Sequence, residues 1–351
     1  MTSRTQVFHI DKGKLGEVIE EASLIIKEGG TVAFPTETVY GLGADALNPA
    51  AVEKIFEAKG RPADNPLIVH VASKEAVGDL AKHIPEKAYT LMDKFWPGPL
   101  TLILQSKEVV PDITTGGLDT VALRMPDNRI ALELIRVSGR PLAAPSANLS
   151  GKPSPTTADH VVADLSGRID AVIDAGAVNV GVESTVIDMS SEPPAILRPG
   201  MISREDIEEE IGGIGIGYED GVHQDIEKVR SPGMKYTHYS PNAVVLLIEG
   251  DNRPVNAKIR EMFCDFKTRG ARVGLLLTDK SDETPDSDAF FLLGSGDRPD
   301  EIALNLFSGL RSLDEQKVDV IIADGSFSQR GVGAAVRNRL RKAAEMIIKV
   351  E

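Results

Sequence analysis

Two cationic side chains flank a glycine in the segment Lys59-Gly60-Arg61-Pro62, between a predicted helix and a predicted strand. A lysine supplies a point charge and an arginine a planar fork of donors, and both suit phosphate oxygens. Pro62 and Pro66 would stiffen the loop and hold the cations in place. The alternative is that Lys59 only favours the C-terminus of its helix while Arg61 is solvated.

A second candidate segment leaves a predicted strand and carries three serines and an asparagine: Ala144-Pro145-Ser146-Ala147-Asn148-Leu149-Ser150-Gly151-Lys152-Pro153-Ser154. Its hydroxyl and amide groups could donate to a phosphate, a ribose or a base, or it could be a polar surface loop. It contains Gly-Lys but is not a Walker A loop, because a serine stands at position 146 where that pattern needs glycine.

Polar residues also gather near the ends of predicted strands. The segment Pro35-Thr36-Glu37-Thr38-Val39-Tyr40 could line a ligand site or form a capped turn. Arg124 and Arg198 each end a strand and could clamp a carboxylate. His70 lies within an apolar strand, where a histidine of the protein core is the more common explanation.

Several other chemistries are disfavoured by the motifs. Gly41-Leu42-Gly43-Ala44-Asp45-Ala46 fits the loose dinucleotide pattern, but four polar or proline residues separate it from the preceding apolar run. The six histidines show no H-E-x-x-H spacing, and no G-x-S-x-G elbow exists, so neither a dedicated metal site nor a serine hydrolase is expected. Cys264 is the only cysteine, which excludes a disulfide scaffold.

The composition is that of an ordinary soluble globular protein. The chain has 351 residues, 42% hydrophobic and 26% charged, with a net charge of −14. No apolar run is long enough to span a membrane, and the N-terminus lacks an apolar signal region, so we expect a cytoplasmic protein with no membrane partner. The acidic balance disfavours a nucleic-acid coating protein but not a nucleotide site, for which a few local cations suffice.

Hydrophobic periodicity predicts alternating strands and helices in the first two hundred residues. Strands are expected at 31–34, 67–71, 100–105, 120–125, 142–145, 171–174, 184–189 and 195–198. Helices are expected near 12–28, 49–58, 74–81, 85–95, 128–138, 156–165 and 203–211. Some strands follow one another without a helix, which indicates a mixed sheet.

The C-terminal part predicts a smaller, open α/β (Rossmann-like) domain. Strands are expected at 243–248, 272–278, 288–293 and 318–323, and helices near 254–269, 299–316 and 332–348. Continuous apolar strands separated by helices are typical of a parallel sheet covered on both faces. The glycine-rich segment 211–217 is not expected to form a stable element. We therefore divide the chain into domains at 1–212 and 242–351, joined by a linker at 213–241 that carries Tyr236 and Tyr239 and is interpreted as a functional lid.

Taken together, the motifs resemble the YrdC-like family in its longer, two-domain form, over essentially the whole chain. The resemblance rests on the segments above in this order, with Asn65-Pro66-Leu67, Trp96-Pro97-Gly98-Pro99-Leu100-Thr101, Arg124-x-Pro126, Ser184-Thr185, Arg198-Pro199-Gly200, the segment Ser231-Pro232-Gly233-Met234-Lys235-Tyr236-x-His238-Tyr239-x-Pro241 and the C-terminal Asn338-Arg339-Leu340-x-Lys342-Ala343-Ala344. It implies a mixed twisted N-terminal sheet with a positively charged cavity. It also implies a nucleotidyltransferase that joins L-threonine, bicarbonate and ATP into L-threonylcarbamoyl-AMP and releases pyrophosphate. The product would serve the downstream machinery that transfers threonylcarbamoyl to tRNA.

The same resemblance implies residue roles. Lys59 and Arg61 would neutralise the triphosphate, with Mg²⁺ held mainly by phosphate oxygens and water rather than by a protein metal site. Positions matching the family's ATP contacts are Arg61, Asn65, Thr120, Ser146, Ser154 and Arg198, and Asn148 with Tyr236 or Tyr239 would complete the nucleotide site. Positions matching its threonine contacts are Thr38, His70, Arg124, Ala144 and Ser184.

Three other functions stay open at this point. The same cavity could belong to a non-catalytic RNA-binding or ribosome-associated factor, and weak RNA binding would also be compatible with the enzyme. A related carbamoyl-transfer enzyme could use carbamoyl phosphate instead. A dehydrogenase built on Gly41-x-Gly43 is the third alternative.

Overall fold

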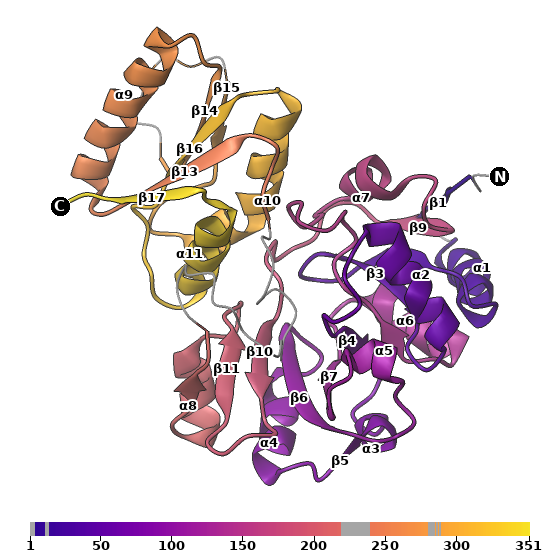
Figure 1. The fold of residues 1–351 in the computed structure, drawn as a ribbon. Coiled ribbons are helices and arrows are strands. Elements are labelled where there is room, and N and C mark those ends of the chain that lie inside the picture. The colour runs from indigo at the N-terminus through magenta and orange to yellow at the C-terminus, as the bar shows by residue number, and fades with distance from the viewer. Residues whose placement is uncertain (1–3, 11–13, 219–238, 280–284, 286, 288) are drawn as a thin grey trace.

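The computed structural model describes residues 4–10, 14–218, 239–279, 285, 287 and 289–351, arranged around two sheets (Figure 1). The first sheet has twelve strands in the order β1-β9-β2-β3-β8-β4-β7-β6-β10-β11-β12, with β5 paired to β6. The second has five strands in the order β15-β14-β16-β13-β17. Among the described residues, no helix is long and apolar enough to cross a membrane.

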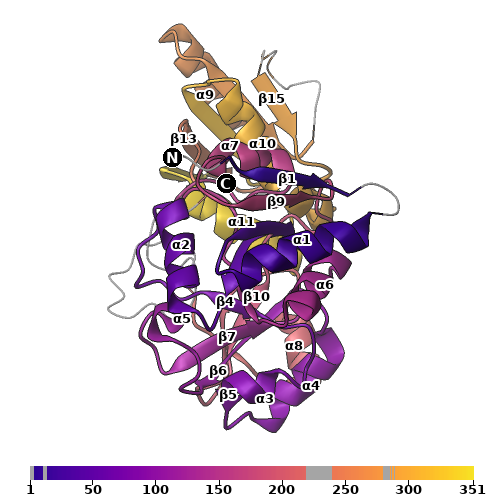
Figure 2. The ribbon, with the colours of Figure 1, turned by 90° about the vertical axis from the view of Figure 1, so that its right-hand side faces the viewer.

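The first sheet is mixed, as predicted. Its strands are β1 (Gln6–His9), β2 (Val32–Pro35), β3 (Tyr40–Asp45), β4 (Ile68–His70), β5 (Ala81–Lys82), β6 (Leu100–Ser106), β7 (Thr120–Arg124), β8 (Leu142–Ala143), β9 (Ala171–Asp174), β10 (Thr185–Asp188), β11 (Ala195–Arg198) and β12 (Gly215–Ile216). β4 and β7 run parallel, whereas β6 and β7 run antiparallel. Eight helices accompany these strands: α1 (Leu15–Lys27), α2 (Pro49–Lys59), α3 (Val77–Leu80), α4 (Glu86–Phe95), α5 (Asp112–Thr115), α6 (Arg129–Ser138), α7 (Ala158–Leu165) and α8 (Arg204–Ile211). Figure 2 shows α1 and α6 side by side.

The helix ends follow from local sequence. The side chain of Asn48 caps α2, and Gly60 ends it in the left-handed conformation with φ 60°. This glycine changes the direction of the chain directly after Lys59, so Arg61 lies outside the helix. Ser203 and Asp206 form a capping box at the start of α8.

The second sheet is parallel throughout and is covered on both faces, as predicted. Its strands are β13 (Val244–Glu249), β14 (Val273–Leu277), β15 (Ala289–Leu292), β16 (Val320–Asp324) and β17 (Met346–Lys349), and its helices are α9 (Asn252–Thr268), α10 (Pro299–Glu315) and α11 (Val332–Ala343). Leu246 packs with α9, whereas its neighbour Leu247 packs with α10 and α11. Figure 1 shows α9 and α10 on opposite sides of the strands. Such alternation explains why the strands read as continuous apolar runs.

Several elements differ from the sequence prediction, and β1, β3, β5, β12 and α5 were not predicted. Gly41 and Gly43 lie within β3 rather than in a turn, and a Cβ on Gly43 would stand 2.5 Å from the Phe34 ring. These glycines therefore allow close packing and form no dinucleotide loop. The predicted helix 332–348 ends at Ala343, because residues 346–349 pair with β13 as β17. The glycine-rich segment does form a short strand, β12, so the first sheet extends past residue 212.

Candidate functional site

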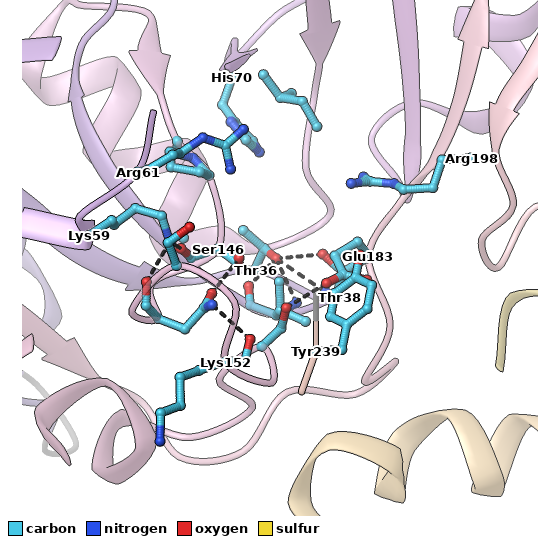
Figure 3. Close-up of a pocket in the computed structure, with 18 of the residues that line it drawn as sticks. Thr36, Thr38, Lys59, Arg61, His70, Ser146, Lys152, Glu183, Arg198 and Tyr239 are labelled. Carbon is cyan, nitrogen blue, oxygen red and sulfur yellow. Dashed lines mark hydrogen bonds between the residues drawn. The ribbon is translucent and has the colours of Figure 1, made fainter. Parts of the chain in front are cut away.

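A buried pocket lies where several strand ends and loops of the first sheet meet (Figure 3). His70 ends β4 and Arg124 ends β7, and the two residues are direct partners in the parallel register. The carboxyl ends of neighbouring parallel strands are a common place for a ligand site in α/β proteins. Lys59 and Arg61 lie on one side of this pocket, and Arg198 lies on the other.

Lys59 anchors the serine-rich loop. Its Nζ donates to the carbonyl oxygens of Ser146 at 2.6 Å and Asn148 at 2.5 Å. Burial, followed by the charge of Arg61, holds the pKa of Lys59 well below its usual value of 10.5. The two carbonyls accept hydrogen bonds from the amine, so this lysine fixes the loop at the wall of the pocket.

The loop that Lys59 holds is ordered by its own side chains. Ser146 Oγ donates to Asn148 Oδ1 at 2.5 Å, and Asn148 Nδ2 donates to the carbonyl of Lys152 at 2.9 Å. The backbone N–H of Ala147 donates to Tyr40 O of β3 at 2.8 Å. These bonds turn a segment that could have been a surface loop into one wall of the pocket.

Arg124, which lines the pocket, pairs with a buried carboxylate beside it. Its Nη2 lies 2.7 Å from Glu37 Oε2, and both side chains are more than nine-tenths buried. Glu37 belongs to the turn between β2 and β3, which is ordered by Thr36 Oγ1 donating to Val39 O at 2.6 Å. Arg124 Nε also donates to the Gly98 carbonyl at 3.3 Å. The guanidinium is therefore held in place beside His70.

His70 is a neutral polar group in this wall. Burial, and then the charge of Arg124, lower its pKa from 6.5 to about 3. Its Nδ1 is buried and has no hydrogen-bond partner within the described part of the chain. A buried nitrogen without a partner is costly, which makes His70 more than a satisfied core histidine.

Arg198 and Ser184 form the opposite wall. Arg198 Nε donates to Ser184 O at 3.0 Å, and its Nη2 donates to Ser184 Oγ at 3.1 Å. Burial lowers the pKa of Arg198 to about 10, so the side chain is still a cation at neutral pH. Ser184 Oγ also shares a hydrogen bond with Thr101 Oγ1 at 2.8 Å.

Most of the predicted site residues meet in this pocket. Those that line it are Thr38, Lys59, Arg61, His70, Arg124, Ala144, Ser146, Asn148, Ser154, Arg198 and Tyr239. Asn65 and Ser184 lie just behind this lining. Both atoms of the Asn65 side-chain amide are buried without a hydrogen-bond partner in the described ranges. The backbone carbonyl of Asn65 accepts a hydrogen bond from Arg61 Nη2 at 3.4 Å.

Two predictions have a different outcome. Thr120 lies at the opposite end of β7 from Arg124, in a groove with Asp119 and Gln105, so the structure does not bring it to the pocket. Tyr236 lies outside the described residues, as does most of the predicted linker. Tyr239 stacks on Phe307 of α10, with ring centroids 5.2 Å apart, and lines the pocket.

The sequence analysis missed one pocket residue that carries charge, Glu183. Its Oε1 accepts a hydrogen bond from Ser154 Oγ, and its Oε2 accepts one from Arg339 of α11 at 3.0 Å. The available signal was its position directly before Ser184, but nothing local marks it as a partner of Arg339. Lys152, part of the serine-rich loop, also lines the pocket.

The donor set of the pocket does not form a metal cage. Within the described ranges no group of three or more His, Cys, Asp or Glu residues is placed to hold an ion. Glu183, which lines the pocket, and Glu37, which lies beside it, each pair with an arginine.

The fold and the site together define a two-domain α/β protein with a buried, cation-lined pocket for an anionic small molecule. The chain belongs to the Sua5/YciO/YrdC family, in the form that also carries the Sua5 C-terminal domain. The family model described as "Telomere recombination" matches residues 24–200, and the model described as "Threonylcarbamoyl-AMP synthase, C-terminal domain" matches residues 202–345.

Known relatives match nearly the whole chain. The threonylcarbamoyl-AMP synthase of Pyrococcus abyssi is 54% identical over 333 residues, which cover 95% of this chain and 96% of the relative. That of Bacillus subtilis is 50% identical and covers 93% of this chain and 92% of the relative. The crystal structure of P. abyssi Sua5 complexed with L-threonine matches with a TM-score of 0.94 and 52% identity, covering 99% of this chain and all of the other.

Proposed function

We propose that this chain is a threonylcarbamoyl-AMP synthase, which uses ATP to convert L-threonine and bicarbonate into L-threonylcarbamoyl-AMP for tRNA modification. The observation that carries the proposal is one pocket that joins two kinds of site. Lys59, Arg61 and the serine-rich loop suit a triphosphate, while Arg124 and His70 at the adjoining strand ends suit an amino acid. The similarity to threonylcarbamoyl-AMP synthases over both domains supports the same function.

The reaction has two steps. With CO₂, the threonine amine attacks the carbon and loses one proton to give a carbamate. With bicarbonate, the amine proton leaves together with a hydroxide as water, and the same carbamate forms. A carbamate oxygen then attacks the α-phosphorus of ATP, and the bond from that phosphorus to the bridging oxygen of the β-phosphate breaks, so pyrophosphate leaves. Such adenylyl transfer depends on positioning and charge neutralisation more than on a covalent nucleophile.

At the nucleotide end, Lys59 and Arg61 neutralise negative charge on the triphosphate, and Arg198 approaches from the opposite wall. Ser146, Asn148 and Ser154 line this end, where their hydrogen bonds hold the loop in shape. Asn65, behind them, has a side-chain amide without a partner in the described ranges. Mg²⁺ bound to the phosphates would supply further charge neutralisation. Thr120 was expected here from the resemblance, but it would need a different approach of the ligand to take part.

At the amino-acid end, Arg124 binds the threonine carboxylate as a charge-assisted pair. The small side chain of Ala144 leaves room for the substrate side chain, and Thr38, His70 and Ser184 surround it. His70 is neutral at pH 7, so it offers a hydrogen bond without adding a charge beside Arg124. Tyr239 closes the pocket on the side of the second domain. Excluding water in this way protects a labile carbamate.

The decisive assay measures pyrophosphate release from the full chain with ATP, Mg²⁺ and bicarbonate, adding one amino acid at a time. We expect release with threonine, and much less with serine, valine or no amino acid. Omitting bicarbonate should remove the threonine-dependent signal. Release that does not depend on the amino acid contradicts the proposal.

Two other outcomes would indicate different functions. Steeply salt-dependent RNA binding without ATP turnover would favour an RNA-binding or ribosome-associated factor. Turnover of carbamoyl phosphate in place of bicarbonate would favour a related carbamoyl-transfer enzyme. The tRNA-modifying partners, weak RNA binding and a cytoplasmic location remain predictions.

A further inference from the structure

The second domain contributes one arginine to the back of the pocket. Arg339 lies on α11 and is fully buried. Its Nε donates to Glu183 Oε2 at 3.0 Å, its Nη2 donates to the Glu183 carbonyl at 3.4 Å, and its Nη1 donates to the Pro199 carbonyl. A single guanidinium from one domain therefore binds two separate segments of the other.

Those two segments carry residues of the site. Glu183 directly precedes Ser184, and Pro199 directly follows Arg198. Arg198 in turn binds both the carbonyl and the hydroxyl of Ser184. The approach is close, because a Cβ on Gly200 would stand 2.3 Å from the backbone nitrogen of Thr185. Arg339 thus fixes the place where the start of β10 and the end of β11 meet.

Arg339 also helps to keep the Glu183 side chain ionised. Burial acts to raise the pKa of Glu183, but the charges of Arg339 and Arg198 and the hydrogen bond from Ser154 hold it below 4.5. Glu183 is therefore an anion in a pocket proposed to bind a triphosphate. A buried carboxylate without its partner would be poorly solvated and would repel phosphate groups.

We propose that Arg339 is a positioning residue for ATP, which makes the second domain part of the active site. It neutralises Glu183 and holds Arg198 at the pocket wall, although it is not itself among the residues that line the pocket. This inference rests on the proposed function, because ATP is the ligand whose binding it controls. The competing interpretation is that Arg339 only holds the two domains together.

The same helix provides a matched control. Arg341, two residues further along α11, binds Glu249 with 2.6 Å between Nη2 and Oε2, and both side chains are buried. This pair lies entirely within the second domain, and neither residue lines the pocket. Arg341→Met therefore removes a similar buried ion pair from the same helix without changing the charge at the site.

The experiment compares Arg339→Met, Arg339→Lys, Arg341→Met and the double variant R339M/E183Q. ATP affinity is measured by calorimetry, the KM values for ATP and threonine by pyrophosphate release, and folding by thermal unfolding. We expect Arg339→Met to weaken ATP binding on the order of 100-fold, since it leaves a buried charge unpaired. Arg339→Lys keeps the charge but loses the fork, so its loss should be clearly smaller. Arg341→Met should lower thermal stability and leave ATP affinity unchanged.

The double variant separates the two interpretations. If Arg339 acts by balancing Glu183, removing both charges should restore ATP affinity to within about fivefold of the parent value. If Arg339 only joins the domains, the double variant will bind ATP no better than Arg339→Met, which overturns the inference. An Arg339→Lys loss equal to that of Arg339→Met also overturns it. If the parent protein binds ATP but releases no pyrophosphate with threonine, the proposed function fails while the affinity comparison still tests Arg339.

Discussion

Arg124 Nη2 and Glu37 Oε2 lie 2.7 Å apart in a buried ion pair beside the pocket. Glu37 presents to this arginine the same chemical group that threonine would present. The threonine carboxylate must therefore share the guanidinium with Glu37 or displace it. Arg124 therefore has two roles that experiments can distinguish: pairing with Glu37 in the fold and binding the carboxylate of the substrate.

Arg124→Ala should raise the KM for threonine on the order of 100-fold, because it removes a charge-assisted pair to the carboxylate. The KM for ATP should change far less. The same variant leaves Glu37 buried and unpaired, so its free energy of unfolding should fall by about 3 to 5 kcal/mol. Steady-state pyrophosphate release and urea unfolding measure the two effects.

The double variant R124A/E37Q is the control. Removing both charges should recover much of the lost unfolding free energy, but it should leave threonine affinity as weak as in Arg124→Ala. Recovery of both properties together would mean that Arg124 acts only as the partner of Glu37. Equal effects on the KM for threonine and for ATP would likewise contradict the clamp.

Arg61→Ala tests the nucleotide end. It should lower kcat/KM for ATP about 100-fold, the usual effect of removing one preorganised donor at a developing charge. Arg136, on the exposed side of α6, provides a surface arginine for comparison. Arg136→Ala should leave ATP turnover unchanged. Release of pyrophosphate by Arg61→Ala at the parent rate would remove Arg61 from the site.

His70 makes a pH-dependent contribution to stability. Its pKa is about 3 in the folded protein, against 6.5 for an ordinary histidine, so the folded state favours the neutral form. Below pH 6.5 the unfolded chain binds a proton that the folded chain does not, so stability is present above pH 6.5 and is lost as the pH falls towards 3. Between pH 7 and pH 5 the loss should be about 2 kcal/mol.

His70→Gln should remove this part of the pH dependence. The measurement is urea unfolding of the parent and of His70→Gln at pH 7 and pH 5, and the quantity compared is the change in unfolding free energy of each protein. Other groups titrate equally in both and cancel. The same slope in both proteins would show that His70 is not held neutral by the fold.

Tyr239 joins the pocket to the second domain. Tyr239→Ala removes its stacking on Phe307 and part of the pocket wall, and should lower the free energy of unfolding by about 3 kcal/mol. Its KM for ATP should rise about tenfold, since each tenfold change corresponds to about 1.4 kcal/mol of lost binding. Tyr239→Phe keeps the ring, so it should lose less than half as much stability. Similar losses in both variants would assign the effect to the hydroxyl rather than to the stacked ring.

Local patterns predicted most of the fold because one face of each element is buried. The continuous apolar run of β13 packs on both faces, and the mixed first sheet follows from strands that succeed one another without helices. β3 was not predicted, because glycine is a poor strand residue by propensity. Gly43 is needed there because the Phe34 ring lies where a Cβ would stand, and that approach is a tertiary property.

The end of α11 illustrates a second kind of failure. Residues Met346–Lys349 continue an apolar pattern that fits a helix, but they complete the second sheet beside β13. A short apolar run fits a helix and a strand equally well. Residues 346–349 form a strand because they can pair with the free edge of β13. Boundaries of this kind depend on a partner that is about a hundred residues away in the chain.

For the pocket, the sequence pointed to side chains whose own chemistry suits a ligand, but not to a side chain whose partner lies on a distant element. Arg61, Ser146 and Arg198 have chemistry that suits phosphate wherever they lie. The negative charge of Glu183 does not suit a phosphate. That charge is balanced mainly by Arg339, which is 156 positions away in the chain. Thr120 shows the converse, since the family resemblance assigned it to the nucleotide site, whereas it lies at the end of β7 away from the pocket.

The separation between Glu183 and Arg339 has a consequence for how the protein is made. At synthesis rates of about 5 to 20 residues per second, the ribosome adds Arg339 roughly 8 to 30 s after Glu183. The first domain can assemble its sheet during this interval while the charge of Glu183 is still unbalanced. On the proposed role of Arg339, a nascent chain would acquire its nucleotide affinity late, when the second domain docks and not when the first one folds.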